Sequence, residues 1–238
     1  MANATAKAKD ENTWPAPARS NPYEDKTSWE AAFRANRFRK IGEIIESVIS
    51  EKGECRVVDL GGTEEYWRVG EEFLQRHAGK IHIILVNTDP TEVRDSDLFS
   101  AVQASATEKN LLGGEKFDFV HSNSVIEHVG ETSDMALFAE NVRRLAQRYY
   151  VQTPNYWFPF EPHFRFIGFQ YLPERLRIEM LHRMRLGFFQ RQRNWSDAAW
   201  LVRHHRLLSA SQMKAFFPDA EIIFEKVFFL RKSIIAIR

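Results

Sequence analysis

Short apolar segments alternate with helical segments along much of the chain, and this alternation limits the fold more than any other sequence feature. Residues 56–60 and 80–86 predict two buried strands, the second rich in β-branched residues. Strands that are apolar on both faces are typical of parallel sheets covered by helices on both sides. Val102 marks a weaker strand, and residues 117–121 and 148–152 predict two more. The pattern therefore predicts a doubly wound α/β sheet.

The end of the chain departs from the parallel pattern. The last apolar runs, residues 221–226 and 233–237, are joined by a connection too short for a crossover helix. We therefore expect an antiparallel hairpin, in which the last strand runs against the others. Ser209 and Gln212 have the spacing of a capping box that starts a short helix before this hairpin.

The length of 238 residues fits one domain with an insertion. Residues 1–26, rich in Ala, Lys, Asn and Pro, predict a flexible N-terminal tail. The folded domain is expected to span residues 27–238, beginning with a capping box at Thr27. Its first helix should end at Gly53, because glycine tolerates a left-handed cap. The alternation stops at about residues 156–208, which predicts a helical cap inserted between strands five and six.

The predicted cap is aromatic and basic, with nine arginines against four acidic residues, whereas the whole chain carries a formal charge of only +1. One interpretation is a helical cap with a small aromatic core and solvated arginines. A second is an acceptor pocket that favours anionic molecules. A third is peripheral contact with an anionic membrane surface. The chain as a whole lacks the basic excess typical of nucleic-acid-binding proteins, which argues against nucleic acid as a partner.

The cysteine and histidine residues form no sequence pattern typical of a disulfide or a metal site. Cys55 is the single cysteine, which excludes an intrachain disulfide and a thiolate zinc cluster. The neighbouring side chains of His204 and His205 should point apart, so we expect no metal. The N-terminus lacks the apolar segment of a signal peptide, and no run approaches the length of a membrane span. Together these features predict a cytoplasmic location.

Polar or glycine-rich loops follow four of the predicted strands. In open α/β sheets, ligands bind at the carboxyl ends of the strands, where glycine allows close approach to the backbone. These loops therefore predict a ligand site along one edge of the sheet. They are residues 59–63, 87–90, 122–129 and 153–163.

The segments VVDLGG, LVNTDP, FDFVHSNSVIEHV and YYVQTPNYWFPFEPH resemble the class I S-adenosylmethionine-dependent methyltransferases. The last segment is similar to a subgroup of small methyltransferases with a P-N-x-x-F-P-x-E-P-H loop. The resemblance covers about residues 30–155 and 207–238. It implies a Rossmann-like fold with seven strands and a reversed last strand, and S-adenosylmethionine as the cofactor. The usual glycine-rich loop is altered here, because Thr63 and Glu65 replace its second and third glycines.

The resemblance also implies a set of cofactor contacts. The methionine end of the cofactor would be lined by Asp59, Gly61 and Gly62, and the ribose would be held by Asn87 or Asp89. The adenine would lie between Ser105 and Ala106. The methionine and sulfonium would lie beside Ser122, Asn123 and Ser124. Because the loop lies at the surface of the sheet, we expect Gly61→Val to abolish cofactor binding without unfolding the protein.

Transfer of a methyl group to oxygen or nitrogen needs an aligned acceptor and often a base. His163 is the first candidate for the base because Glu161 lies beside it, and His128 is the second. The alternative is that Glu161 and His163 only order their loop, and that His128 caps or packs. Residues of the loop and cap, namely Asn155, Tyr156, Trp157 and Arg165, are candidates for acceptor binding.

The sequence thus predicts a methyltransferase acting on O or N of a small molecule or glycoconjugate, with an anionic acceptor as one option. Two alternatives stay open: a binding module that keeps the fold without turnover, and a nicotinamide-dependent oxidoreductase. The reversed last strand argues against the oxidoreductase. The sequence leaves the acceptor and the oligomeric state open.

Overall fold

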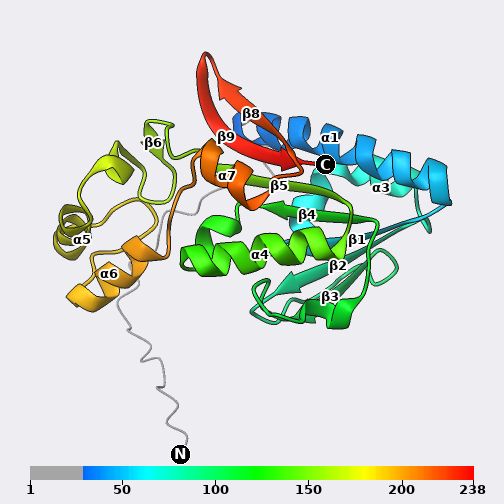
Figure 1. Cartoon of the computed structure of the whole chain (residues 1–238), viewed down its shortest axis with the longest axis horizontal. Helices are drawn as coiled ribbons and strands as arrows, with labels where there is room; N and C mark the ends of the chain where they lie inside the picture. Colours follow the sequence, from blue (N-terminus) through cyan, green and yellow to red (C-terminus); the bar gives the residue numbers. More distant parts are fainter. Residues whose placement is uncertain (1–28) are drawn as a thin grey trace, which may run out of the picture.

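A seven-stranded sheet forms the centre of the molecule in a computed structural model that describes residues 29–238 (Figure 1). The strand order is β3-β2-β1-β4-β5-β9-β8. Only β9 runs against the other six, because it pairs antiparallel with both β5 and β8. The strands are β1 (Cys55–Leu60), β2 (Ile81–Asn87), β3 (Phe99–Gln103), β4 (Phe119–Asn123), β5 (Arg148–Pro154), β8 (Glu221–Val227) and β9 (Leu230–Ile237).

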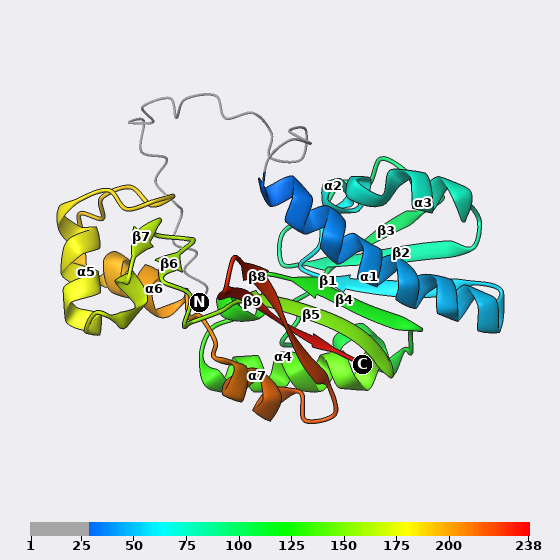
Figure 2. The same ribbon diagram turned by 90° about the horizontal axis from the view of Figure 1, so that it is seen from above.

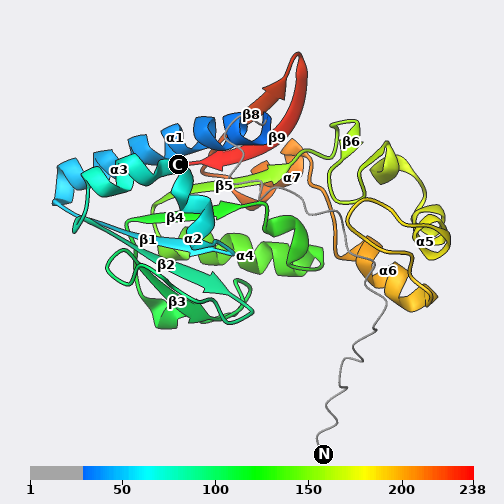
Figure 3. The ribbon, with the colours of Figure 1, turned by 180° about the vertical axis from the view of Figure 1, so that it is seen from behind.

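Helices cover both faces of the sheet, as Figures 1 and 3 show from opposite sides. One face packs against α1 (Trp29–Lys52), α2 (Glu64–Trp67) and α3 (Glu71–Arg76). The other packs against α4 (Thr132–Leu145) and α7 (Ala210–Phe216). Each layer has its own apolar core, so the central strands are buried on both sides. This arrangement confirms the predicted doubly wound α/β fold.

The segment between β5 and β8 forms a separate lobe at one end of the sheet (Figure 2). It contains the hairpin β6 (Phe160–Glu161) and β7 (Phe166–Ile167) and the helices α5 (Glu174–Arg183) and α6 (Trp195–Arg203). A third apolar core, built from aromatic and aliphatic side chains such as Phe164 and Phe169, lies entirely within this lobe. We call residues 156–208 the cap.

Local sequence signals place several element ends correctly. Gly53 follows α1 with a φ of 86°, the left-handed conformation that glycine favours. The capping box of Ser209 and Gln212 starts α7. Four short 3₁₀ turns complete the described elements: Arg68–Gly70, Leu111–Gly114, Ile126–His128 and Phe169–Tyr171.

The helical segment that follows β1 is not continuous, because the turn Arg68–Gly70 divides it into α2 and α3. Phe38 of α1 packs directly against this break. A Cβ atom at Gly70 would lie 1.7 Å from Cζ of Phe38. The close approach of α1 therefore interrupts the helical segment.

The predicted tail, residues 1–26, and the capping box at Thr27 lie outside the described residues. Within residues 29–238, no helix combines the length and apolar character that crossing a membrane requires.

Candidate active site

The loops that follow β1, β2 and β4 meet at one edge of the sheet. Asn87, the last residue of β2, donates a hydrogen bond from Nδ2 to the carbonyl of Gly62 over 2.7 Å. Ser122 of β4 donates from Oγ to the carbonyl of Leu60 over 2.9 Å. The predicted cofactor residues of these three strands therefore belong to one hydrogen-bonded region.

Asp59 lies inside this region rather than on its surface. Its side chain is completely buried. Oδ2 accepts a hydrogen bond from Trp67 Nε1 over 2.8 Å, and Oδ1 lies 2.7 Å from Nδ1 of His121. Both oxygens thus have protein partners, so the carboxylate fixes the end of β1 relative to α2 and β4.

The glycine pair after β1 is required by packing. Gly61 has a φ of 75°, and a Cβ atom there would lie 2.5 Å from Cγ2 of Val125. A Cβ atom at Gly62 would lie 1.7 Å from Oδ2 of Asp59. We therefore correct the expectation that Gly61→Val would leave the fold unaffected, because valine would disturb the loop itself.

The residues after β4 are held in a constrained turn. Ser124 has a φ of 56°, which is uncommon outside glycine, and its Oγ donates to Oε1 of Gln152 over 2.9 Å. Asn123 accepts a hydrogen bond at Oδ1 from Nη1 of Arg37, which reaches over from α1. The turn thus has hydrogen-bond partners on β5 and on α1.

The remaining predicted cofactor residues lie around the same edge. Asp89 is exposed, two residues beyond Asn87. Ser105 and Ala106 are half-buried after β3, and Oγ of Ser105 lies 2.8 Å from Oγ1 of Thr107. Their roles toward a cofactor stay predictions.

The three predicted catalytic residues come together in space. Nδ1 of His163 lies 2.7 Å from Oε1 of Glu161, and Nε2 of His163 lies 3.1 Å from Nε2 of His128. His128 follows β4, whereas Glu161 and His163 belong to the cap, so the cluster forms where the cap meets the sheet. The ring of His205 adds a third imidazole, 4.8 Å from His128 between ring centroids.

Glu127 is a member of this cluster that the sequence did not single out. It is fully buried, and its Oε2 accepts a hydrogen bond from Oγ1 of Thr153 over 2.9 Å. Its Oε1 is also buried and has no hydrogen-bond partner among the described residues. The neighbouring His128 was the only signal in the sequence that pointed to this position.

Burial and charge act differently on the acids and imidazoles of the cluster. Burial raises the pKa of Glu127 to about 7. Burial lowers the pKa of His205 and that of His128, although part of His128 remains exposed. The neighbouring imidazole of His163 lowers both pKa values further. For His163, burial opposes protonation, but the hydrogen bond and charge of Glu161 outweigh it and raise the pKa.

A cavity of about 350 Å³ lies between the cap and the helices α4 and α7, next to this cluster. Glu161 and His205 line it, together with Tyr156. Three arginines that were not singled out from the sequence also line it: Arg177, Arg203 and Arg206. Nε of Arg177 is buried without a hydrogen-bond partner among the described residues.

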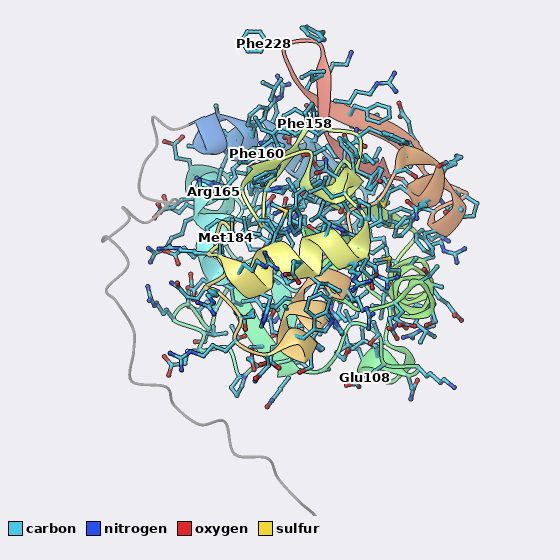
Figure 4. The ribbon with its side chains drawn as sticks, turned by 90° about the vertical axis from the view of Figure 1, so that its left-hand side faces the viewer. Glu108, Phe158, Phe160, Arg165, Met184 and Phe228 are labelled. Atoms are coloured by element: carbon cyan, nitrogen blue, oxygen red, sulfur yellow. The ribbon has the colours of Figure 1, made fainter. Side chains whose placement is uncertain are left out.

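The other predicted acceptor residues lie elsewhere. Asn155 is buried and donates from Nδ2 to the carbonyl of Arg231, which fixes the loop after β5. Trp157 is exposed and stacks with Tyr171. Arg165 is exposed on the cap (Figure 4). Its guanidinium lies over the ring of Phe188. Of the predicted acceptor residues, only Tyr156 lines the cavity described above.

Comparisons with solved structures find distant similarity to methyltransferases. An O-methyltransferase family protein from Burkholderia thailandensis is 10% identical, with a TM-score of 0.46, over 90% of this chain and 60% of its own. The N-methyltransferase NodS from Bradyrhizobium japonicum WM9 is 9% identical, with a TM-score of 0.46, over 91% of this chain and 96% of its own. The small RNA methyltransferase HEN1 is 18% identical, with a TM-score of 0.48, over 84% of this chain and 24% of its own.

No family model matches the chain, and no curated protein matches it. The chain spans about 60% of the length of the Burkholderia protein. These similarities are too distant to assign an activity, so the functional argument rests on the chain's own residues.

Proposed function

We propose that this protein is an S-adenosylmethionine-dependent methyltransferase that acts on an oxygen or nitrogen atom of a small molecule or glycoconjugate with an anionic group. The proposal depends on one observation: the loops after β1, β2 and β4 meet at the carboxyl edge of a sheet whose last strand is reversed. Ligands of open α/β sheets bind at this edge.

The polar groups at this edge fit such a cofactor. The backbone of Gly61 and Gly62 would approach the methionine end, and Asn87 or Asp89 would hold the ribose. When bound, S-adenosylmethionine supplies a methyl group that its sulfonium already activates. The protein's task is then to align the acceptor and to exclude water.

The cavity under the cap is the proposed site for the acceptor. Arg177, Arg203 and Arg206 line it, and guanidinium groups bind carboxylate and phosphate in a bidentate manner. Arg203 already contacts Glu174 with Nε and Nη2, at 3.0 and 2.8 Å. Arg177 is the best candidate for an anionic group of the acceptor, because its buried Nε lacks a partner among residues 29–238.

His163 is the residue proposed from the sequence as the general base, which would take a proton from the acceptor. Its Nδ1 faces Glu161, so Nε2 is the atom left to accept a proton. That atom lies 3.1 Å from Nε2 of His128. A base role therefore requires His128 to move or to give up this contact.

The acceptor proposal is tested by screening anionic sugars and phenolic acids for formation of S-adenosylhomocysteine. For an accepted compound, we expect Arg177→Gln to raise KM for the acceptor at least tenfold, with little change in KM for the cofactor. Arg165→Gln on the exposed face of the cap serves as the matched control, with a smaller effect. Equal effects of the two variants would contradict the placement of the acceptor in the cavity.

A further inference from the structure

Glu127, His128 and His163 bring three potential ligand atoms close together. One ligand atom from each residue lies within 4.8 Å of the others. Glu127 and His128 come from the turn Ile126–His128 after β4, whereas His163 comes from the cap, 35 residues further along the chain. A backbone hydrogen bond from Arg206 to the carbonyl of Glu127, over 3.1 Å, also connects this turn to the cap.

The separation of the two imidazole nitrogens is close to that of two ligands on one ion. Zinc binds imidazole nitrogen at about 2.0–2.1 Å with tetrahedral geometry, which places two such nitrogens about 3.3 Å apart. Nε2 of His128 and Nε2 of His163 are 3.1 Å apart. A direct hydrogen bond between the rings would give a similar distance, so the third residue decides between the two explanations.

Glu127 favours an ion. Its Oε1 is buried without a hydrogen-bond partner among the described residues, and such a group is costly unless something satisfies it. A hydrogen bond between the two imidazoles would leave this oxygen unsatisfied. A cation held by all three residues would satisfy it, and would remove the need for either Nε2 to carry a proton.

The surrounding hydrogen bonds have the form that metal sites use to orient their ligands. Nδ1 of His163 contacts Oε1 of Glu161, whose other oxygen accepts from the backbone amide of Phe164. Oε2 of Glu127 accepts from Oγ1 of Thr153. Carboxylates that hold the far nitrogen of a ligand histidine, and hydrogen bonds that hold a ligand carboxylate, are the usual outer partners of such sites.

We propose that Glu127, His128 and His163 bind one divalent transition-metal ion, through Oε1 of the glutamate and Nε2 of each histidine. Two imidazoles and one carboxylate favour zinc and its neighbours over magnesium, which prefers oxygen ligands. Three protein ligands leave a position open for water or a substrate atom. The partial exposure of His128 gives the ion a route from solvent. The expectation from the sequence was that no metal binds.

One consequence rests on the proposed function. Glu161 and His205, which lie beside the proposed ion, also line the cavity assigned to the acceptor. An acceptor hydroxyl at the open position would lose its proton more readily, because a bound cation stabilises the oxygen anion. The ion would then replace the base role that the sequence suggests for His163.

The test measures metal binding alone, so its result is independent of any methyl transfer. Protein without a histidine tag is stripped with a chelator and titrated with Zn²⁺ against a chromophoric competitor, and with Mg²⁺ in a separate experiment. We expect one Zn²⁺ per chain. His163→Ala and Glu127→Gln should each weaken Zn²⁺ binding at least tenfold, and His204→Ala should not.

His204 is the matched control because it lies in the cap but stacks on Trp200, outside the cluster. Glu127→Gln keeps the size of the side chain, and circular dichroism checks that each variant is folded. If Glu127→Gln does not fold, His163→Ala alone tests the metal site. His163 is partly exposed, so we expect its replacement to leave the fold intact. Absence of stoichiometric Zn²⁺ binding, tighter binding of Mg²⁺, or equal affinity in the parent and His163→Ala would overturn the proposal. The cluster would then be a hydrogen-bonded network without a metal.

Discussion

Asp59 occupies a position where the resemblance places a cofactor contact, yet its carboxylate is buried against Trp67 and His121. The apolar run that precedes it was enough to place Asp59 at the end of a strand. Its partners could not be predicted, because His121 lies 62 residues away in sequence and becomes a neighbour only through the pairing of β1 with β4. Position was therefore predictable for this residue, whereas its contacts were not.

Asn87 and Asp89 can be separated by their geometry. Asn87 holds the carbonyl of Gly62 through Nδ2, whereas Asp89 is exposed beyond the strand. We expect Asn87→Ala to weaken S-adenosylmethionine binding more than Asp89→Ala, because it releases the glycine loop in addition to any ribose contact. Calorimetric titration of both variants measures this order. A larger loss in Asp89→Ala would assign the ribose to Asp89.

Cys55 is predicted to be inert in the folded protein. The residue is 1% exposed, and burial together with the nearby charge of Asp118 raises the pKa of its thiol to about 12. The reactive thiolate is therefore scarce at neutral pH. A thiol reagent such as dithionitrobenzoate should react with less than a tenth of the native protein at pH 8, and with one thiol per chain in guanidinium. Rapid stoichiometric reaction of the native protein would contradict this prediction.

At the scale of elements, Arg37 joins α1 to the strand β8 at the far edge of the sheet. Its Nε and Nη2 contact the two carboxylate oxygens of Glu225 at 2.8 and 2.6 Å, and its Nη1 contacts Asn123. The side chains of Arg37 and Glu225 are 10% and 6% exposed. Removing one partner of such a buried pair typically costs about 3–5 kcal/mol.

We therefore expect Arg37→Met to lower the free energy of unfolding by about 3 kcal/mol, because Glu225 stays buried without its partner. The double variant Arg37→Met/Glu225→Leu should lose less than the single variant, because neither charge remains. Urea unfolding measures both values. If the single variant loses less than 1 kcal/mol, the pair does not stabilise the fold as argued.

The strands and the final hairpin could be predicted because their signals are local. The break between α2 and α3 could not, since it depends on Phe38 of α1 packing against Gly70. Arg175 and Arg177, two of the nine cap arginines, lie on the same helix but have different surroundings. Residues two apart on a helix are related by a rotation of about 200° around its axis, so they face nearly opposite sides. Arg177 therefore lines the cavity, whereas Arg175 faces an outer surface with Pro173 and Glu179.

In the whole molecule, the candidate site is built from residues of both the sheet and the cap. The proposed cofactor edge belongs to β1, β2 and β4. The cluster of Glu127, His128 and His163 joins the turn after β4 to the cap, and the cap lies beside the sheet in Figure 1. His128 and His163 are separate candidates for the catalytic base in the sequence. Their contact depends on how residues 156–208 fold back onto the sheet, which no local pattern encodes.

Calorimetry on the full chain tests whether the carboxyl edge of the sheet binds S-adenosylmethionine. Titrations with S-adenosylmethionine, S-adenosylhomocysteine and NAD are compared under the same conditions. We expect the first two to bind at one site per chain with micromolar affinity, on the order of −8 kcal/mol, and we expect that NAD does not bind. Binding of NAD in place of both S-adenosyl compounds, or binding of none of the three, would contradict this expectation.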